Sequence, residues 1–124
     1  MADTSRLRIL IADDHAPMAT ALERVVSLDC DVVGRLTDGS SLLAETKRLQ
    51  PDILLLDLHL PKVNSLSACE EIRRMIPCTR VIILTGSLDP DLRPKVLAAG
   101  ASAFIDKAAA LRDLPTAIAD TQVP

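Results

Sequence analysis

The sequence predicts a protein of the α/β class, in which a parallel β-sheet is covered by helices on both faces. Two observations lead to this prediction. Short apolar runs of strand length recur at intervals of roughly 22 to 28 residues, enough for a strand, a helix and two turns. Segments with helical periodicity lie between these runs, so strands and helices alternate along the chain.

Five apolar runs are the predicted strands, and they comprise residues 7–12, 30–33, 53–56, 81–84 and 103–105. The third and fourth runs are apolar throughout and do not alternate with polar residues. Continuous apolar character is typical of parallel strands that are buried on both faces. Because crossover connections between parallel strands are right-handed, the intervening helices cover both faces of a doubly wound sheet.

Four segments have the apolar spacing of amphipathic helices, and these fall within residues 18–26, 42–49, 66–76 and 111–118. Turn and capping residues agree with these limits. Gly39 and Ser40 precede the second segment and Pro51 follows it, while Asn64 and Ser65 can cap the third.

The helix expected between the fourth and fifth strands is less regular. Asp89 and Pro90 would suit a helix start, but Pro94 lacks a backbone donor and its ring would crowd the carbonyl of Pro90. Arg93 precedes a proline and is therefore disfavoured from helical dihedral angles. We predict a short helix that starts near Pro94 or is distorted in its first turn.

Composition excludes several classes of protein. With 14 Lys and Arg against 17 Asp and Glu, the net charge of −3 offers no general attraction to nucleic acid, so we expect no direct DNA binding. No apolar run approaches the roughly 20 residues of a membrane span. Cys30, Cys69 and Cys78 lack the spacing of a zinc site or disulfide framework, and we expect small buried thiols in a cytoplasmic protein.

The length of 124 residues predicts one domain over 1–124, with its core at about residues 7–120. Residues 116–124 are either the end of the fifth helix or the beginning of a linker to an output domain.

Polar residues lie just after four of the predicted strands: Asp13 and Asp14, then Asp57, Thr85 and Lys107. In the flavodoxin-like strand order 2-1-3-4-5, ligands bind at the carboxyl ends of the strands, where the order reverses between the first and third. The three carboxylates should therefore meet. Three negative charges and one ammonium leave a net charge of −2, which favours a hard divalent cation such as Mg²⁺.

A carboxylate in such a cluster can attack a phosphoryl group and form an acyl phosphate. The reaction needs a cation that bridges the charged oxygens, and a hydroxyl and an ammonium for the remaining phosphoryl oxygens. Asp57 is the candidate nucleophile because it ends a buried strand, and Thr85 and Lys107 can reach over it.

Four segments of the sequence resemble the receiver domains of response regulators over nearly the whole chain. They are Ile11-Ala12-Asp13-Asp14-His15, Asp57-Leu58-His59-Leu60-Pro61, Leu84-Thr85-Gly86 and Gly100-Ala101-Ser102-Ala103-Phe104-Ile105-Asp106-Lys107. More narrowly, the chain is similar to receivers that precede a LuxR-type helix-turn-helix domain. The segments that carry this likeness are Ala12-Asp13-Asp14-His15, Asp31-Val32-Val33-Gly34 and Pro51-Asp52-Ile53-Leu54-Leu55-Leu56-Asp57.

The resemblance implies that Asp57 accepts a phosphoryl group from a sensor histidine kinase or a phosphotransfer protein. It also implies that Asp14 binds Mg²⁺ directly and Asp13 largely through water. Asp57 and the backbone carbonyl of His59 complete the metal site.

The resemblance further implies that Thr85 and Lys107 contact the phosphoryl group and that Phe104 changes rotamer as Thr85 moves. Such a chain is a regulatory phosphoacceptor and not an enzyme, although it phosphorylates itself from small donors with Mg²⁺ and dephosphorylates itself. Its expected output is transcriptional, with homodimerisation on phosphorylation.

Two positions depart from the receiver pattern, because Leu60 stands where Met is usual and Ser65 where Gly is usual. We therefore expect Asn64 to supply any left-handed turn after Asp57. His59 and Ser87 each lie two residues beyond a site residue, and we hypothesise that they adjust the access of water to the acyl phosphate.

Three other functions remain open. A pseudo-receiver would serve only as an interaction module, but it typically lacks one of the acidic, Thr or Lys positions that this sequence retains. An Asp-dependent phosphatase expects a second Asp where His59 stands. A nucleotide- or flavin-binding domain expects a Gly-rich phosphate loop, and the chain has only four glycines.

Overall fold

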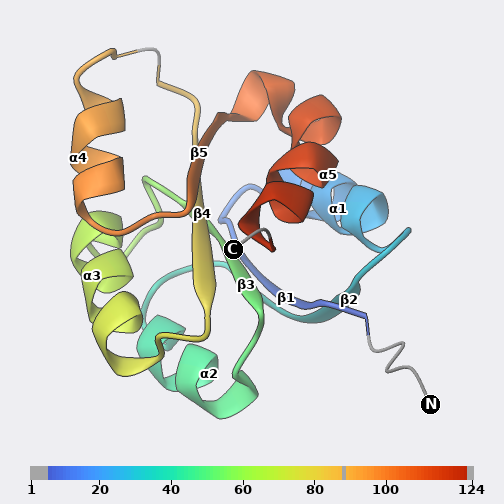
Figure 1. The fold of residues 1–124 in the computed structure, drawn as a ribbon, viewed down its shortest axis with the longest axis horizontal. Helices are drawn as coiled ribbons and strands as arrows, with labels where there is room; N and C mark the ends of the chain where they lie inside the picture. Colours follow the sequence, from blue (N-terminus) through green and yellow to red (C-terminus); the bar gives the residue numbers. More distant parts are fainter. Residues whose placement is uncertain (1–5, 88, 123–124) are drawn as a thin grey trace.

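A computed structural model describes residues 6–87 and 89–122, and its five parallel strands form one sheet in the order β2-β1-β3-β4-β5 (Figure 1). The strands are β1 (Arg8–Ala12), β2 (Asp31–Leu36), β3 (Ile53–Asp57), β4 (Arg80–Thr85) and β5 (Ala103–Asp106). The helices are α1 (Ala16–Val26), α2 (Leu42–Leu49), α3 (Ser65–Met75), α4 (Leu92–Ala98) and α5 (Ala110–Thr121), with a short 3₁₀ turn at Lys107–Ala109. The predicted α/β class and strand order are confirmed.

The helices divide into two layers, with α1 and α5 on one face of the sheet and α2, α3 and α4 on the other (Figure 1). The central strand β3 shows how the sheet serves both layers. Its residues Leu54 and Leu56 belong to the core beneath α2 and α3, while Ile53 and Leu55 belong to the core beneath α1 and α5. All four are fully buried, which explains why this strand is apolar at every position.

Side-chain caps fix the starts of two helices next to the carboxyl edge of the sheet. His15 precedes α1, and its Nδ1 accepts a hydrogen bond from the backbone N–H of Met18 at 3.3 Å. Asn64 precedes α3, and its side-chain oxygen accepts from the N–H of Ser67 at 3.0 Å. The predicted capping role of Asn64 is thereby confirmed.

Helix α4 is short, as predicted, but it begins at Leu92, two residues before the expected start at Pro94. Pro94 is tolerated because it is the third residue of the helix, where a backbone N–H has no intrahelical acceptor. Asp89 does not cap the helix, since its carboxylate accepts from the N–H of Asp91 in the preceding turn, at 2.9 Å.

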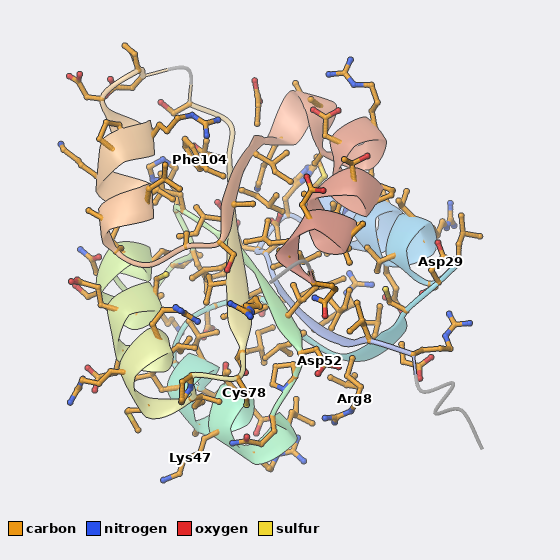
Figure 2. The ribbon with its side chains drawn as sticks, viewed as in Figure 1. Arg8, Asp29, Lys47, Asp52, Cys78 and Phe104 are labelled. Atoms are coloured by element: carbon orange, nitrogen blue, oxygen red, sulfur yellow. The ribbon has the colours of Figure 1, made fainter. Side chains whose placement is uncertain are left out.

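Two local predictions were wrong. The left-handed residue after Asp57 is Lys62, with a φ of 67°, whereas Asn64 has a φ of −88° because it adopts the extended conformation of a helix cap. Cys78 is exposed, because it follows the end of α3 at the surface (Figure 2), whereas Cys30 and Cys69 are buried as expected.

The loop after β3 is held by the loop after β2. The N–H of Gly39 donates to the carbonyl of Pro61 at 2.8 Å. A Cβ atom at Gly39 would stand 2.2 Å from Cγ1 of Val63, so only glycine permits this close approach. Lys62 Nζ lies 3.6 Å from the Asp38 carboxylate. These contacts fix the loop that begins at Asp57.

Helix length and hydropathy bear on membrane insertion. Over residues 6–87 and 89–122, no helix combines the length and the apolar character that crossing a membrane would require.

Candidate functional site

The carboxyl ends of β1 and β3 bring three carboxylates together. Asp13, Asp14 and Asp57 each offer an oxygen, and these oxygens lie within 4.8 Å of one another. Asp13 and Asp57 are buried, with 2% and 4% of their surfaces exposed, while Asp14 is exposed. The cluster forms because β1 and β3 are neighbours in the sheet and both end at this edge. The predicted meeting of these residues is therefore seen in the fold.

Lys107 follows β5, and its ammonium reaches across the sheet edge to two of these carboxylates. Its Nζ lies 3.0 Å from Oδ2 of Asp57 and 3.0 Å from Oδ2 of Asp13. Burial by itself would lower the pKa of Lys107, but its hydrogen bond with Asp57 and its interactions with the charges of Asp57 and Asp13 outweigh that effect and raise the pKa. Lys107 is therefore protonated at neutral pH.

Backbone and side-chain contacts hold Asp57 in one orientation. Its Oδ1 accepts a hydrogen bond from the N–H of His59 at 3.0 Å. Its carbonyl accepts from the hydroxyl of Ser65 at 2.7 Å and from the N–H of Leu60 at 3.2 Å. Ser65 is buried. Sequence reasoning missed this contact of Ser65, although its departure from the usual glycine marked the position.

Thr85 ends β4 and is buried, with 1% of its surface exposed. It neighbours the acidic cluster because Leu84, the residue before it, pairs with Asp57 in the sheet. Its Oγ1 accepts from the N–H of Ser87 at 3.0 Å. The hydroxyl oxygen of Ser87 in turn accepts from the N–H of Asp89 at 3.2 Å, so a hydrogen-bonded turn continues directly from Thr85.

Phe104 and His59 flank the site in different ways. Phe104 lies on β5, is partly buried, and packs against the core beneath α3 and α4 (Figure 2). It lines a cavity of about 330 Å³ together with Thr85 and Ser87. The side chain of His59 is exposed at the edge of the site. The structure thus brings Asp13, Asp14, Asp57 and Lys107 into one cluster, and it places Thr85, Ser87 and Phe104 around a neighbouring cavity.

The residues present fit a hard divalent cation. Oδ2 of Asp13 is buried and accepts no hydrogen bond within the described part of the chain, although the Lys107 ammonium is close to it. An oxygen of this kind is normally satisfied by a partner. Carboxylate and carbonyl oxygens are the ligands that Mg²⁺ prefers, and the local charge of three carboxylates and one ammonium leaves −2 to be neutralised.

Comparison with known proteins agrees with this geometry. The family model described as the response regulator receiver domain matches residues 9–119. Response regulator GacA of Pseudomonas viridiflava is 30% identical in an alignment 115 residues long that covers 90% of this chain and 53% of GacA. The chain thus spans about half the length of the curated relatives it matches.

Solved structures show the same fold. The non-phosphorylated receiver domain of the stress response regulator RcsB from Escherichia coli superposes with a TM-score of 0.87 at 26% identity, covering 95% of this chain and 94% of that one. A two-component response regulator of the LuxR family from Aurantimonas sp. superposes with a TM-score of 0.86 at 27% identity, covering 94% and 85%. The chain belongs to the response regulator receiver domain family, and its structural neighbours are response regulators of the LuxR family.

Proposed function

We propose that this chain is a phosphorylation switch in which Asp57 accepts a phosphoryl group from a sensor histidine kinase or a phosphotransfer protein. One observation carries the proposal. The buried Asp57 carboxylate lies 3.0 Å from the Lys107 ammonium and within 4.8 Å of the oxygens of Asp13 and Asp14. A nucleophile, a cation and a set of metal ligands are thus within reach of a single phosphoryl group.

The proposed transfer uses the residues as the structure holds them. A carboxylate oxygen of Asp57 attacks the phosphorus of a phosphohistidine, and the P–N bond breaks as the new P–O bond forms. The imidazole of the donor leaves with the electron pair of the broken bond. The N–H of His59 and the hydroxyl of Ser65 keep Asp57 oriented, while Lys107 and Thr85 hold phosphoryl oxygens.

Asp13, Asp14, Asp57 and the backbone carbonyl of His59 would hold Mg²⁺. The bound ion supplies charge neutralisation between the carboxylates and the phosphoryl oxygens. In this proposal Thr85 moves toward the phosphoryl group, and Phe104 changes rotamer in response. The phosphoryl group makes new contacts only in the arrangement in which Thr85 and Phe104 have moved, so it increases the population of that arrangement over the present one.

His59 and Ser87 are proposed to adjust self-dephosphorylation. The imidazole of His59 is exposed next to the backbone N–H that donates to Asp57, and the half-buried Ser87 donates its N–H to Oγ1 of Thr85. Each can change how readily water reaches the acyl phosphate. We expect His59→Ala or Ser87→Ala to change the rate of dephosphorylation, followed as loss of the phosphorylated mass; unchanged rates in both variants would refute this role.

Acetyl phosphate tests the phosphoacceptor directly. With Mg²⁺, the wild-type chain should gain the mass of one phosphoryl group, and the adduct should be labile to hydroxylamine, as acyl phosphates are. Asp57→Asn should gain none, and the exposed Asp29→Asn should behave as wild type. No adduct in the wild type, or an equal adduct in Asp57→Asn, would overturn the proposal.

That experiment also distinguishes two of the three alternative functions. A pseudo-receiver module would show no adduct, but all the acidic, Thr and Lys positions of a functional receiver are present in this site. An Asp-dependent phosphatase would turn over donor continuously. The exposed His59 stands where such an enzyme needs its acidic partner.

We further propose that residues 1–124 form one cytoplasmic receiver whose output is transcriptional, with homodimerisation on phosphorylation. The support is the likeness to LuxR-family response regulators and the fact that the chain spans about half of GacA. Light scattering with and without beryllium fluoride tests the dimer, and an unchanged mass would contradict it.

A further inference from the structure

Arg93 makes contacts with Phe104 that the receiver pattern of the sequence does not include. The guanidinium carbon of Arg93 lies 5.4 Å from the centre of the Phe104 ring, which is the geometry of a cation–π interaction. Its Nη2 also donates to the carbonyl of Phe104 at 3.4 Å. Because Arg93 is the second residue of α4, it joins the first turn of that helix to β5.

Phe104 has room to move, because it lines the same cavity as Thr85. A cavity of about 330 Å³ extends from Thr85 and Ser87 to Phe104, and Arg93, Pro90 and the carboxylates of Asp89 and Asp106 complete its lining. Thr85 is buried at one end of this cavity. A shift of Thr85 therefore alters the space beside the Phe104 ring.

The contacts of Arg93 are concentrated on Phe104. Although Asp89 and Asp106 line the same cavity, Arg93 forms no ion pair with a carboxylate in residues 6–87 and 89–122. The side chain is exposed, so the guanidinium is held by the ring face and the backbone carbonyl. Movement of the ring away from this position would break the cation–π contact, whereas the hydrogen bond to the backbone carbonyl does not depend on the ring.

We propose that Arg93 stabilises the unphosphorylated state by holding Phe104 in its present position, and so lowers the affinity of the chain for a phosphoryl group. This inference rests on the proposed phosphorylation switch. Whatever moves the Phe104 ring must first break its cation–π contact with Arg93. A residue that favours one of two states reduces the apparent affinity of any ligand that needs the other.

Beryllium fluoride with Mg²⁺, a phosphoryl mimic, tests the inference. An exposed cation–π interaction of about 0.5–1 kcal/mol corresponds to a factor of about two to five in an equilibrium constant. Arg93→Ala should therefore bind beryllium fluoride about two- to fivefold more tightly than wild type in calorimetric titrations. Arg93→Lys retains a cation and should stay closer to wild type.

Phe104 is the single phenylalanine of the chain, so incorporated fluorophenylalanine gives one ¹⁹F resonance that reports this ring alone. In the absence of the mimic, the resonance of Arg93→Ala should lie between the free and bound positions of wild type. Arg112→Ala is the matched control, because Arg112 is an exposed arginine that contacts Asp113 on α5. It should change neither affinity nor resonance.

A double-mutant comparison decides whether the effect passes through the ring. In a Phe104→Leu background, Arg93→Ala should leave the affinity unchanged. The role of Arg93 would be overturned if Arg93→Ala increased the affinity for beryllium fluoride equally in both backgrounds, or did not increase it in the wild-type background. Binding of beryllium fluoride by the wild type would still support the switch in either case. If the wild type does not bind beryllium fluoride in the presence of Mg²⁺, the proposed switch is refuted, and the proposed role of Arg93 is refuted as well.

Discussion

At the scale of single residues, Lys107 is the counter-ion on which the acidic cluster depends. Its ammonium is 3.0 Å from two buried carboxylates, and its side chain is only 18% exposed. Removing one partner from a partly buried ion pair leaves an uncompensated charge, and this usually costs more than the pair itself contributes. The stability of the chain without Mg²⁺ should therefore be sensitive to this residue.

Lys107→Met keeps the length of the stem and removes the charge. We expect a loss of about 2 kcal/mol in the free energy of unfolding without Mg²⁺, measured by urea denaturation, and a smaller loss in an Asp57→Asn background. The raised pKa means that this contribution is present below the ordinary lysine value of about 10.4 and is lost as pH rises through the higher folded value. The difference from wild type should thus hold from pH 7 to 9 and shrink only at a pH above the ordinary lysine value.

Lys95→Met is the control for that comparison, because Lys95 is exposed on α4. It should stay within about 0.5 kcal/mol of wild type. A Lys107→Met protein as stable as wild type at pH 7 would show that the carboxylates do not need the ammonium.

The three cysteines should differ in reactivity. Burial raises the pKa of Cys69 to about 11 and also raises the pKa of Cys30, whereas Cys78 is exposed. Because the thiolate is the reactive form, Cys78 should react quickly with a disulfide reagent at pH 8, and Cys30 and Cys69 should react slowly. All three should react in denaturant, and Cys78→Ser should remove the fast phase. Two fast thiols in the native protein would contradict the packing around Cys30 or Cys69.

The site residues that the sequence predicted are those whose positions follow from strand ends. Asp13, Asp57 and Thr85 end or directly follow apolar strands, so the limits of those strands located them. Ser65 and Arg93 were not assigned their contacts. The contact of Ser65 depends on the path of the loop after β3, and the contact of Arg93 depends on the packing of α4 against β5. No local sequence pattern encodes either.

At the scale of elements, α5 carries a proline where a helix ordinarily has none. Pro115 is the sixth residue of the helix, so it cannot donate the backbone hydrogen bond that would go to the carbonyl of Leu111. Pro94 lies in the first turn of α4, where no such bond is lost. The two prolines are therefore a matched pair with different expected costs.

Pro115→Ala should stabilise the protein by about 2 kcal/mol. Replacing proline with alanine inside a helix stabilises the folded state by about 3 kcal/mol. The greater conformational entropy of the unfolded chain without the proline offsets up to about 1 kcal/mol of that stabilisation. Pro94→Ala should change the stability by less than about 1 kcal/mol. Urea denaturation of both variants gives the comparison, and a larger gain at Pro94 than at Pro115 would contradict it.

The elements themselves were predictable to different degrees. The buried strand β3 was found from its apolar run, because both of its faces need apolar side chains. The edge strand β2 extends to Leu36, beyond the predicted end at residue 33. Gly34 and the exposed Arg35 interrupt the apolar run there, while pairing with β1 alone maintains the strand.

At the scale of the whole molecule, metal binding should couple the site to global stability. The carboxylates come from β1 and β3 and their counter-ion follows β5, so the site exists only when the sheet is assembled. A ligand that binds the folded state alone stabilises it by RT ln(1 + [L]/Kd). The unfolded chain has no such cluster, because Asp57 and Lys107 are far in sequence from Asp13 and Asp14.

Mg²⁺ at tenfold its Kd should therefore raise the free energy of unfolding by about 1.4 kcal/mol, and EDTA should reverse the gain. Thermal unfolding at constant ionic strength measures it, with an expected rise of about 5 °C for a chain of this size. Asp14→Asn should lose most of the rise, whereas Asp113→Asn, on the surface of α5, should keep it. An equal rise in both variants would mean that Mg²⁺ acts by general screening and not at this cluster.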